Sequence, residues 1–206
     1  MVLAAGRYET DTRAALASTL PSARTFYDIG AAGGFFTRFA LALMRPGTRV
    51  VAIEPFAPSR RDLDVLRPVA EARGIVLDIR PEAIGARDGK AFLAFSESRA
   101  PRLSDRGQRT EVRSLDSLLQ GEGLPDPDVV KVDVEGAEVA ALDGMAALLA
   151  RARPALTVEC HSVPLLHATI GILLEHGYGV RVSRGGDYIG PVIVTTCAPP
   201  PNPLKP

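Results

Sequence analysis

Short apolar, β-branched runs alternate with longer segments of helical periodicity along this chain of 206 residues, and that alternation restricts the fold more than any other feature. The predicted strands are 25–29, 49–54, 75–80, 129–134, 155–160, 178–183 and 188–197. The predicted helices are 35–44, 59–73, 137–152 and 164–176. Several strands are almost entirely apolar, as strands buried on both faces are. The pattern predicts an α/β fold in which helices cover both faces of a mostly parallel sheet.

Two regions depart from this alternation. Within residues 85–113 we predict a β-hairpin, 90–95 against 110–115, around a polar loop at 96–109 that is a candidate cover for a ligand. The chain is interpreted as one domain over 1–197, with a helical N-terminal segment at 1–24. Residues 198–206 form a proline-rich tail that cannot pair in a sheet, because its prolines lack backbone N–H groups.

Composition narrows the class of partner. Lysine plus arginine number 24, as do aspartate plus glutamate, so no net field favours nucleic acid or an anionic membrane surface. The two cysteines, Cys160 and Cys197, have no CxxC spacing, which argues against a disulfide scaffold and a structural zinc site. No signal peptide and no apolar run long enough for a bilayer are apparent. We therefore expect a cytoplasmic protein that acts on a small molecule.

The stretch FYDIGAAGGFFT, residues 26–37, follows the first strand and opens a helix. Its glycines allow a tight turn and a close approach of backbone to ligand, at the strand ends where open parallel sheets bind ligands. The spacing is not the G-x-G-x-x-G of dinucleotide-binding turns, since Ala32 and Phe35 replace two of the glycines. Asp28 would repel a pyrophosphate but attract a cationic sulfonium or ammonium group. The turn therefore predicts a positively charged cofactor.

Glu54 ends the second strand about 20 residues beyond the glycines, where an acid can accept the hydroxyls of a ribose. Pro55 and Phe56 follow it and could flank an adenine ring. S-adenosylmethionine has all the required parts: ribose, adenine, a cationic sulfur and an amino-acid end.

The run KVDVEGAE, residues 131–138, places charges on a strand that should be central. Because an unpaired buried carboxylate is costly, the acids are expected to reach a polar cleft beyond the strand. We predict that Asp133 lies beside the methyl donor. For Glu135 the expectation is a cap on the helix that begins near Gly136. For Lys131, an internal ion pair with one of the acids and a role in the cleft both stay open.

The run TVECHS places Glu159 and His161 at the end of the next strand. His161 is the candidate base, oriented by Glu159, because an imidazole suits a proton acceptor at neutral pH. A purely structural hydrogen bond between the two is the alternative. Another is that Asp133, Glu159 and His161 bind a divalent cation such as Mg²⁺, which would lower the pKa of an acceptor hydroxyl.

These motifs together resemble the FkbM-type S-adenosylmethionine-dependent methyltransferases, over about residues 8–180. The resemblance rests on DIGAAGGFFT, AIEP (52–55), EAIGARDG (82–89), SLDSLL (114–119), KVDVEGAE and TVECH. It implies a Rossmann-like class I fold with seven strands, the last antiparallel, and O-methylation of hydroxyls on sugars, polyketides or other secondary metabolites. By position, the resemblance implies Asp28, Gly30, Ala31 and Gly34 for the methionine part, Glu54 for the ribose, and Glu82, Ala83 and Ile84 for the adenine edge. The other predicted cofactor-binding residues are Thr37, Pro55 and Phe56.

Two other functions stay open at this point. A non-catalytic accessory subunit would keep the cofactor pocket without the chemistry, and an NAD-dependent oxidoreductase would share the fold but not Asp28 or the glycine spacing. The sequence gives neither the methyl acceptor nor the oligomeric state.

Overall fold

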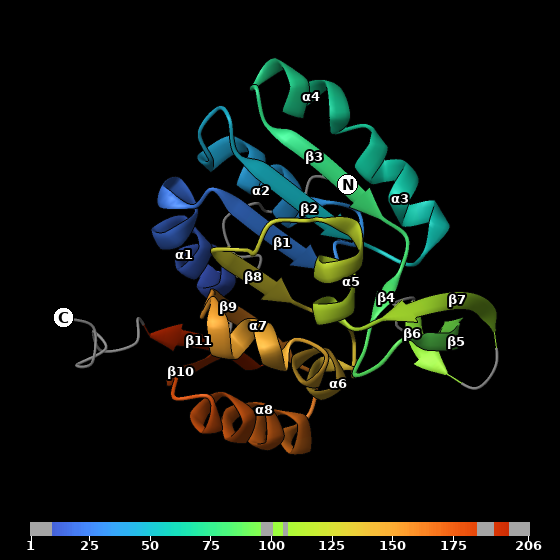
Figure 1. The fold of residues 1–206 in the computed structure, drawn as a ribbon, viewed down its shortest axis with the longest axis vertical. Helices are drawn as coiled ribbons and strands as arrows, with labels where there is room; N and C mark the ends of the chain where they lie inside the picture. Colours follow the sequence, from blue (N-terminus) through green and yellow to red (C-terminus); the bar gives the residue numbers. More distant parts are fainter. Residues whose placement is uncertain (1–9, 96–100, 105–106, 185–191, 198–206) are drawn as a thin grey trace.

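The computed structural model describes residues 10–95, 101–104, 107–184 and 192–197, and shows two β-sheets with flanking helices (Figure 1). The larger sheet has seven strands in the order β10-β11-β9-β8-β1-β2-β3. They are β1 (Thr25–Ile29), β2 (Arg49–Ile53), β3 (Val76–Arg80), β8 (Val129–Val132), β9 (Ala155–Cys160), β10 (Gly179–Arg184) and β11 (Val192–Cys197). β11 alone runs opposite to the other six strands of this sheet. The predicted Rossmann-like fold, with an antiparallel last strand, is confirmed.

Two hydrophobic layers lie on opposite faces of this sheet, because successive side chains of a strand point to opposite sides. Phe26 packs in a layer with α1 (Thr10–Thr19), the 3₁₀ turn Leu20–Ser22, α2 (Phe35–Leu43), α3 (Ala57–Asp64) and α4 (Arg67–Ala72). Tyr27, the next residue, packs in the layer of α5 (Leu115–Glu122), α6 (Glu138–Asp143), α7 (Ala146–Arg151) and α8 (Val163–Glu175). The apolar strands are thus covered on both faces.

The helices differ from the predicted ones where a proline or a close contact interrupts them. The segment 59–73 forms two helices, α3 and α4, since Pro68 cannot donate a backbone hydrogen bond. The segment 137–152 is divided into α6 and α7 at Gly144, where a Cβ atom would lie 2.0 Å from the carbonyl oxygen of Gly85. Helix α5 was not predicted, although Ser114 caps its first turn by accepting from Ser117 N at 3.2 Å.

The smaller sheet has the order β4-β7-β5-β6, with β4 (Ala83–Ile84), β5 (Gly89–Phe95), β6 (Pro101–Ser104) and β7 (Gln108–Arg113). β5 and β7 pair antiparallel, as predicted for 90–95 and 110–115, but β7 spans 108–113 and residue 115 begins α5. The interpretation of 96–109 as a loop is wrong at β6, which pairs with β5. Residues 96–100 and 105–106 lie outside the described residues, so the covering role of this segment stays a prediction. In Figure 1 the arrowheads of β1, β2, β3 and β8 point toward the small sheet.

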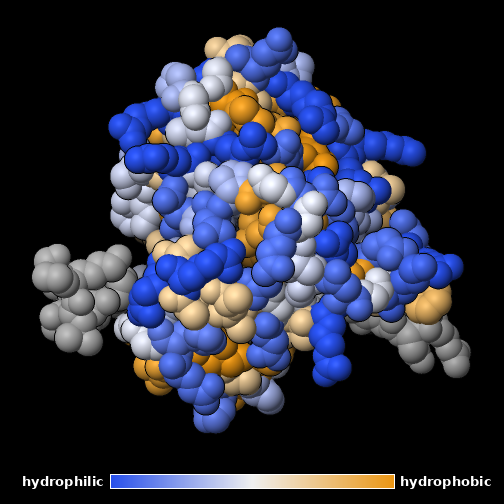
Figure 2. Space-filling model, viewed as in Figure 1, coloured by the Kyte–Doolittle hydropathy of each residue, from blue (hydrophilic) through white to orange (hydrophobic). Residues whose placement is uncertain are grey.

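The face of the molecule in Figure 2 is mostly hydrophilic, with an apolar area where Figure 1 places the edge strand β3. Val76 of this strand is 47% exposed, and the charged Asp78 and Arg80 follow it. Charged side chains on an edge strand discourage pairing with another chain. None of the described helices combines the length and the hydrophobicity that a bilayer crossing requires. The predicted tail at 198–206 lies outside the described residues.

Candidate functional site

The glycine turn after β1 is packed directly against the segment that follows β8. Gly30 has a φ of +78°, and a Cβ atom there would lie 1.7 Å from the carbonyl oxygen of Asp133. Gly34 also has a positive φ, +82°, with Leu63 close to its missing side chain. A Cβ atom at Gly33 would have no described neighbour within 4 Å, so that side of the turn is open. At Gly30 and Gly34, the positive φ and the close neighbour together favour glycine.

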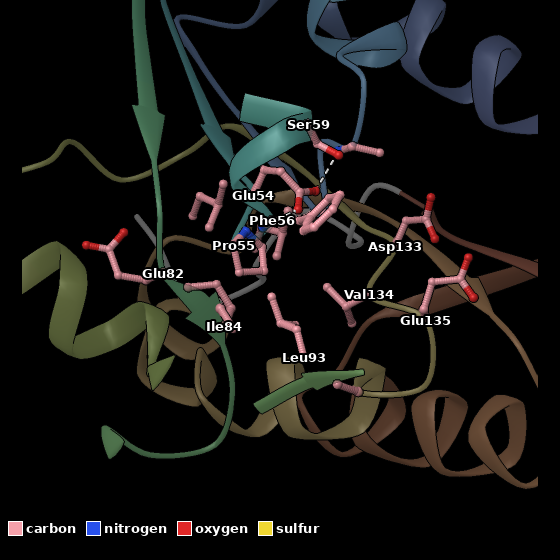
Figure 3. A pocket seen from close by; sticks show the side chains of 16 residues that line it. Glu54, Pro55, Phe56, Ser59, Glu82, Ile84, Leu93, Asp133, Val134 and Glu135 are labelled. Atoms are coloured by element: carbon pink, nitrogen blue, oxygen red, sulfur yellow. Dashed lines mark hydrogen bonds between the residues drawn. The ribbon is translucent and has the colours of Figure 1, made fainter. Parts of the chain in front are cut away.

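A cavity of about 360 Å³ lies at the carboxyl ends of β1, β2 and β8, where open α/β sheets bind their ligands (Figure 3). Its apolar lining consists of Ile29, Ile53, Pro55, Phe56, Ala83, Ile84, Leu93 and Val134. Leu93 comes from β5, so the small sheet forms one wall. Figure 3 shows Leu93 facing Pro55 and Phe56 across the cavity. The walls suit a flat apolar group held between them.

Glu54 is the buried acid of this cavity, 4% exposed. Its Oε2 accepts from Ala32 N at 2.8 Å, and its Oε1 accepts from Phe56 N at 2.7 Å. Burial raises the pKa of Glu54, although both hydrogen bonds oppose the rise. Each carboxylate oxygen has a second lone pair, so hydroxyl donors of a ligand could still be accepted. The predicted position of Glu54, Pro55 and Phe56 at the ligand site agrees with this lining.

Glu82, Ala83 and Ile84 also border the cavity. The carboxylate of Glu82, however, points away from the cavity centre in Figure 3 and forms an ion pair with Arg80 at 2.9 Å. A contact of this segment with an adenine edge would therefore come from backbone groups and from Ile84. That contact stays a prediction.

Asp28 does not face a ligand space in the way that the sequence suggested. It is fully buried, its Oδ2 accepts from Thr37 Oγ1 at 2.7 Å, and its Oδ1 lies 3.6 Å from Lys131 Nζ. Asp28 and Lys131 are register partners on the parallel strands β1 and β8. Burial raises the pKa of Asp28, while Lys131 and Thr37 oppose the rise. The expectation that this carboxylate attracts a cationic cofactor directly is wrong, because Lys131 already balances its charge.

Lys131 is itself buried, with a side chain 3% exposed. Its Nζ lies 3.1 Å from Asp133 Oδ2 and 4.9 Å from the centre of the Phe36 ring. Burial acts to lower the pKa of Lys131, but the surrounding carboxylates of Asp133, Asp28 and Glu159 outweigh it and raise that pKa. Of the two interpretations that the sequence left open for Lys131, the structure shows the internal ion pair, with two acids instead of one.

A second cavity, of about 450 Å³, lies along the glycine turn. It shares Gly30, Ala32 and Asp133 with the first cavity, and Lys131 and Arg38 add positive charge to its lining. The remaining lining residues are Ala31, Gly33, Gly34, Phe35 and Phe36. Two spaces of different character, one apolar and one with basic groups, thus meet at Asp133.

Asp133, Glu135 and His161 converge at this junction, each offering one ligand atom within 4.8 Å of the others. His161 Nε2 lies 3.5 Å from Asp133 Oδ1 and 3.6 Å from Glu135 Oε2. Figure 3 shows Asp133 and Glu135 side by side, at the end of the cavity opposite Glu82. Burial acts to raise the pKa of Asp133, but Lys131 and a hydrogen bond with Glu159 lower it. Asp133 is therefore held ionised.

The residue that orients His161 is Glu138, and the sequence-based prediction of Glu159 for this role is wrong. Nδ1 of His161 lies 2.7 Å from Oε1 of Glu138, which is fully buried. Glu159 is also buried and contacts Asp133 instead. The reason is that β9 ends at Cys160, so His161 no longer follows the side-chain alternation that would place it beside Glu159. A catalytic role for Glu159 stays a prediction, now through Asp133.

Glu135 was expected to cap a helix, but it does not. Helix α6 begins at Glu138, and it is Glu138 that accepts from Gly136 N at 2.9 Å. Glu135 instead adopts a left-handed φ of +52°, and its carboxylate reaches His161. Such a conformation is costly for a residue with a side chain and is found preferentially at functional sites. In the sequence, the only sign that Glu135 and Glu138 contact His161 was their position two and five residues after Asp133.

The donor set fits S-adenosylmethionine. The apolar walls suit adenine, Glu54 suits the ribose hydroxyls, and the basic lining of the second cavity suits a carboxylate. The acids around Asp133 lie where the two spaces meet and suit the positive charge of a sulfonium or an ammonium group.

Comparison with known proteins also points to a methyltransferase. The family described as Methyltransferase FkbM domain matches residues 28–180. The AMB antimetabolite synthetase AmbE of Pseudomonas aeruginosa is 30% identical over an aligned length of 212, gaps included. The alignment covers 80% of this chain and 10% of that protein. This chain therefore spans only a tenth of the length of that relative.

Solved structures share the fold. Methyltransferase FkbM from Methylobacillus flagellatus superposes with a TM-score of 0.64 at 20% identity, covering 84% of this chain and 43% of that one. Precorrin-6y C5,15-methyltransferase from Geobacter metallireducens has a TM-score of 0.58 at 21% identity, with coverages of 94% and 90%. Fibrillarin from Aeropyrum pernix, solved with natively bound S-adenosyl-L-methionine, has a TM-score of 0.54 at 13% identity, with coverages of 87% and 68%. With the family match extending from the glycine turn to β10, the chain belongs to the FkbM methyltransferase domain family.

Proposed function

We propose that this domain transfers a methyl group from S-adenosylmethionine to a hydroxyl oxygen of a small molecule, such as a sugar, a polyketide or another secondary metabolite. The observation that carries the proposal is the junction at Asp133, where an apolar cavity with a buried acid meets a cluster of carboxylates and an imidazole. Membership in the FkbM family supports the reaction class. An oxygen acceptor suits this cluster because a hydroxyl must lose a proton on methylation.

Residues of the first, mostly apolar cavity would hold the nucleoside. Pro55, Phe56 and Leu93 would enclose the adenine, and the Glu54 carboxylate, fixed by two backbone N–H groups, would accept from the ribose hydroxyls. The glycine turn, with Lys131 and Arg38 near it, would bind the methionine end. When bound, S-adenosylmethionine supplies an electrophilic methyl group on a sulfonium. The chain's main contribution is to align the acceptor oxygen with that methyl for in-line displacement.

The acceptor proton would pass to the group of Asp133, Glu135 and His161. We keep His161 as a candidate base, with Glu138 holding its Nδ1 and leaving Nε2 for the proton. Burial acts to lower the pKa of His161, but Glu138, Asp133 and Glu135 raise it above its usual range. Nε2 also lies 3.5 Å from Asp133 Oδ1 and 3.6 Å from Glu135 Oε2, so proton transfer to this nitrogen competes with its interaction with two carboxylates.

A titration by calorimetry tests the cofactor assignment. The wild-type protein should bind S-adenosylhomocysteine and show no comparable affinity for NAD. Glu54→Gln should weaken the binding by about tenfold or more, near 1.4 kcal/mol, because the amide oxygen can accept from only one of the two backbone N–H groups and the amide nitrogen accepts from neither. The control is Glu71→Gln, at an exposed residue of α4. Preferential binding of NAD would contradict the proposal, as would an unchanged affinity in Glu54→Gln.

Transfer itself is measured with labelled S-adenosylmethionine and a panel of hydroxylated metabolites. His161→Ala should keep S-adenosylhomocysteine binding and lose most of the transfer. A protein that binds the cofactor but methylates none of a broad panel would favour an accessory, non-catalytic role. Methylation confined to amine acceptors would refute the choice of oxygen.

A further inference from the structure

We propose that Asp133, Glu135 and His161 bind a divalent cation of the Mg²⁺ and Mn²⁺ class at the junction of the two cavities. The role of the ion, to bind the acceptor hydroxyl, rests on the proposed function. The binding site itself rests on the side chains alone. It differs from the set expected from the sequence, since Glu135 takes the place of Glu159.

The spacing of the three ligand atoms suits a single ion. His161 Nε2 is 3.5 Å from Asp133 Oδ1 and 3.6 Å from Glu135 Oε2. Two ligands that each lie about 2.1 Å from an ion are about 3.0 Å apart when they meet at a right angle, and farther apart at wider angles. Small side-chain rotations would bring all three atoms into range. The side chains are 15–28% exposed, so water and an acceptor can also reach the ion.

Glu138 prepares the imidazole for this role. An ionised carboxylate only accepts hydrogen bonds, so the 2.7 Å contact places a proton on Nδ1 of His161. In the neutral ring Nε2 then carries a lone pair, directed toward two carboxylate oxygens. The three electron-rich atoms must be balanced by a positive charge, which is either a proton on Nε2 or a cation bound between them. A carboxylate behind a histidine is also the usual outer partner of a metal-binding imidazole.

The charges around Asp133 also favour a bound cation. Asp28, Asp133, Glu135, Glu138 and Glu159 form one connected group of acids, four of them at least partly paired with Lys131 or His161. Lys131 Nζ lies 3.1 Å from Asp133 Oδ2, so the other oxygen of Asp133, Oδ1, can act as a metal ligand. Buried charges are stable only when they are paired or coordinate metals. The hydrogen bond between Asp133 and Glu159 requires one proton, so at most four negative charges face the two basic groups, and a further positive charge can still be accommodated.

The ligand chemistry selects the class of metal. Two carboxylates and one imidazole are mostly hard donors, which suit Mg²⁺ or Mn²⁺. Three protein ligands leave further coordination positions for water and for an acceptor hydroxyl. A hydroxyl bound there would have a lower pKa and would lose its proton more readily. His161 would then act as a ligand, and the cluster would need no free base on Nε2.

The experiment measures Mn²⁺ binding to the metal-free protein by electron paramagnetic resonance and calorimetry, with and without saturating S-adenosylhomocysteine. The wild-type protein should bind one Mn²⁺, which Mg²⁺ displaces. Glu135→Gln should weaken the binding by at least about tenfold, because it removes a charged ligand and keeps the side-chain size. Glu71→Gln should bind like the wild type. S-adenosylhomocysteine affinity, measured on each variant, reports whether the fold and the cofactor site are intact.

Absence of Mn²⁺ binding at millimolar concentration, with and without S-adenosylhomocysteine, would overturn the inference and leave a proton on Nε2 as the positive charge. Equal affinity in Glu135→Gln and the wild type would overturn it as well. Failure of S-adenosylhomocysteine to bind a protein that still binds Mn²⁺ would refute the proposed function and leave the metal site standing. The two proposals can therefore fail separately.

Discussion

Replacing Lys131 by methionine should destabilise the protein far more than the loss of an ordinary surface lysine. Lys131 lies 3.6 Å from Asp28 and 3.1 Å from Asp133, and Asp28 is fully buried. Methionine keeps most of the side-chain volume and can pack against the Phe36 ring, so the loss of charge is the main change. Removing one partner of a buried ion pair costs about 3–5 kcal/mol, because the other charge stays buried without compensation.

The matched control is Lys90→Met on β5. Lys90 pairs with Glu111 at 3.6 Å, a separation equal to that between Lys131 and Asp28, but these side chains are 54% and 62% exposed. Exposed pairs contribute about 0–1 kcal/mol. The free energy of unfolding, measured by urea denaturation, should therefore fall by several kcal/mol in Lys131→Met and hardly change in Lys90→Met. The double variant Asp28→Asn with Lys131→Met should recover part of the loss, since it removes the orphaned charge.

The same variant has a predictable pH dependence. Burial already raises the pKa of Asp28 in the wild type, and without Lys131 that pKa should rise further. Unfolded Asp28 titrates near its ordinary pKa of about 3.9. Above that value the folded variant binds more protons than the unfolded chain, so its stability falls as pH rises through the raised pKa. The deficit relative to wild type should be smallest in acid. Equal losses in Lys131→Met and Lys90→Met at neutral pH would refute the argument.

Three further substitutions test the glycine turn and the helix that follows it. Gly30→Ala should cost well over the ~1–2 kcal/mol of a left-handed alanine, because the new methyl would lie 1.7 Å from a backbone carbonyl oxygen. Gly33→Ala has open space at this position and should stay within about 0.5 kcal/mol of wild type; equal losses in the two thermal or urea transitions would contradict this account. Thr37→Val keeps the side-chain shape but removes a hydrogen bond to a buried carboxylate, and should cost about 1.5–3 kcal/mol in the same denaturation assay. A wild-type transition for Thr37→Val would show that this hydrogen bond adds nothing.

The sequence predicted the large sheet well because its strands are defined locally. The predicted bounds of 25–29 and 155–160 equal those of β1 and β9. Helix lengths were predicted less well where an interruption depends on a distant contact. Gly144 divides its helix because the backbone of Gly85 passes against it, and no periodicity within 137–152 records that neighbour. The single domain over 1–197 stays a prediction.

The site was predictable where strand ends alone determine position, as at Glu54. It was not predictable where two strands must be placed in register. Asp28 and Lys131 are partners across β1 and β8, and their pairing removes the free negative charge that the sequence suggested. The partner of His161 depended on the turn at Glu135 and on the end of β9 at Cys160. Both features depend on tertiary structure. The turn brings Glu135 to His161, and the end of β9 leaves Glu159 in contact with Asp133 instead.

The small sheet has no strand in common with the large one, yet its Leu93 forms a wall of the main cavity. A molecule that fills this cavity would contact β5 on one side and the segment after β2 on the other. It would therefore link two sheets that share no backbone hydrogen bonds. Local opening of the small sheet costs only part of the global unfolding free energy. An occupied cavity would add the ligand's binding energy to that cost. The occupant would therefore stabilise the small sheet against local opening.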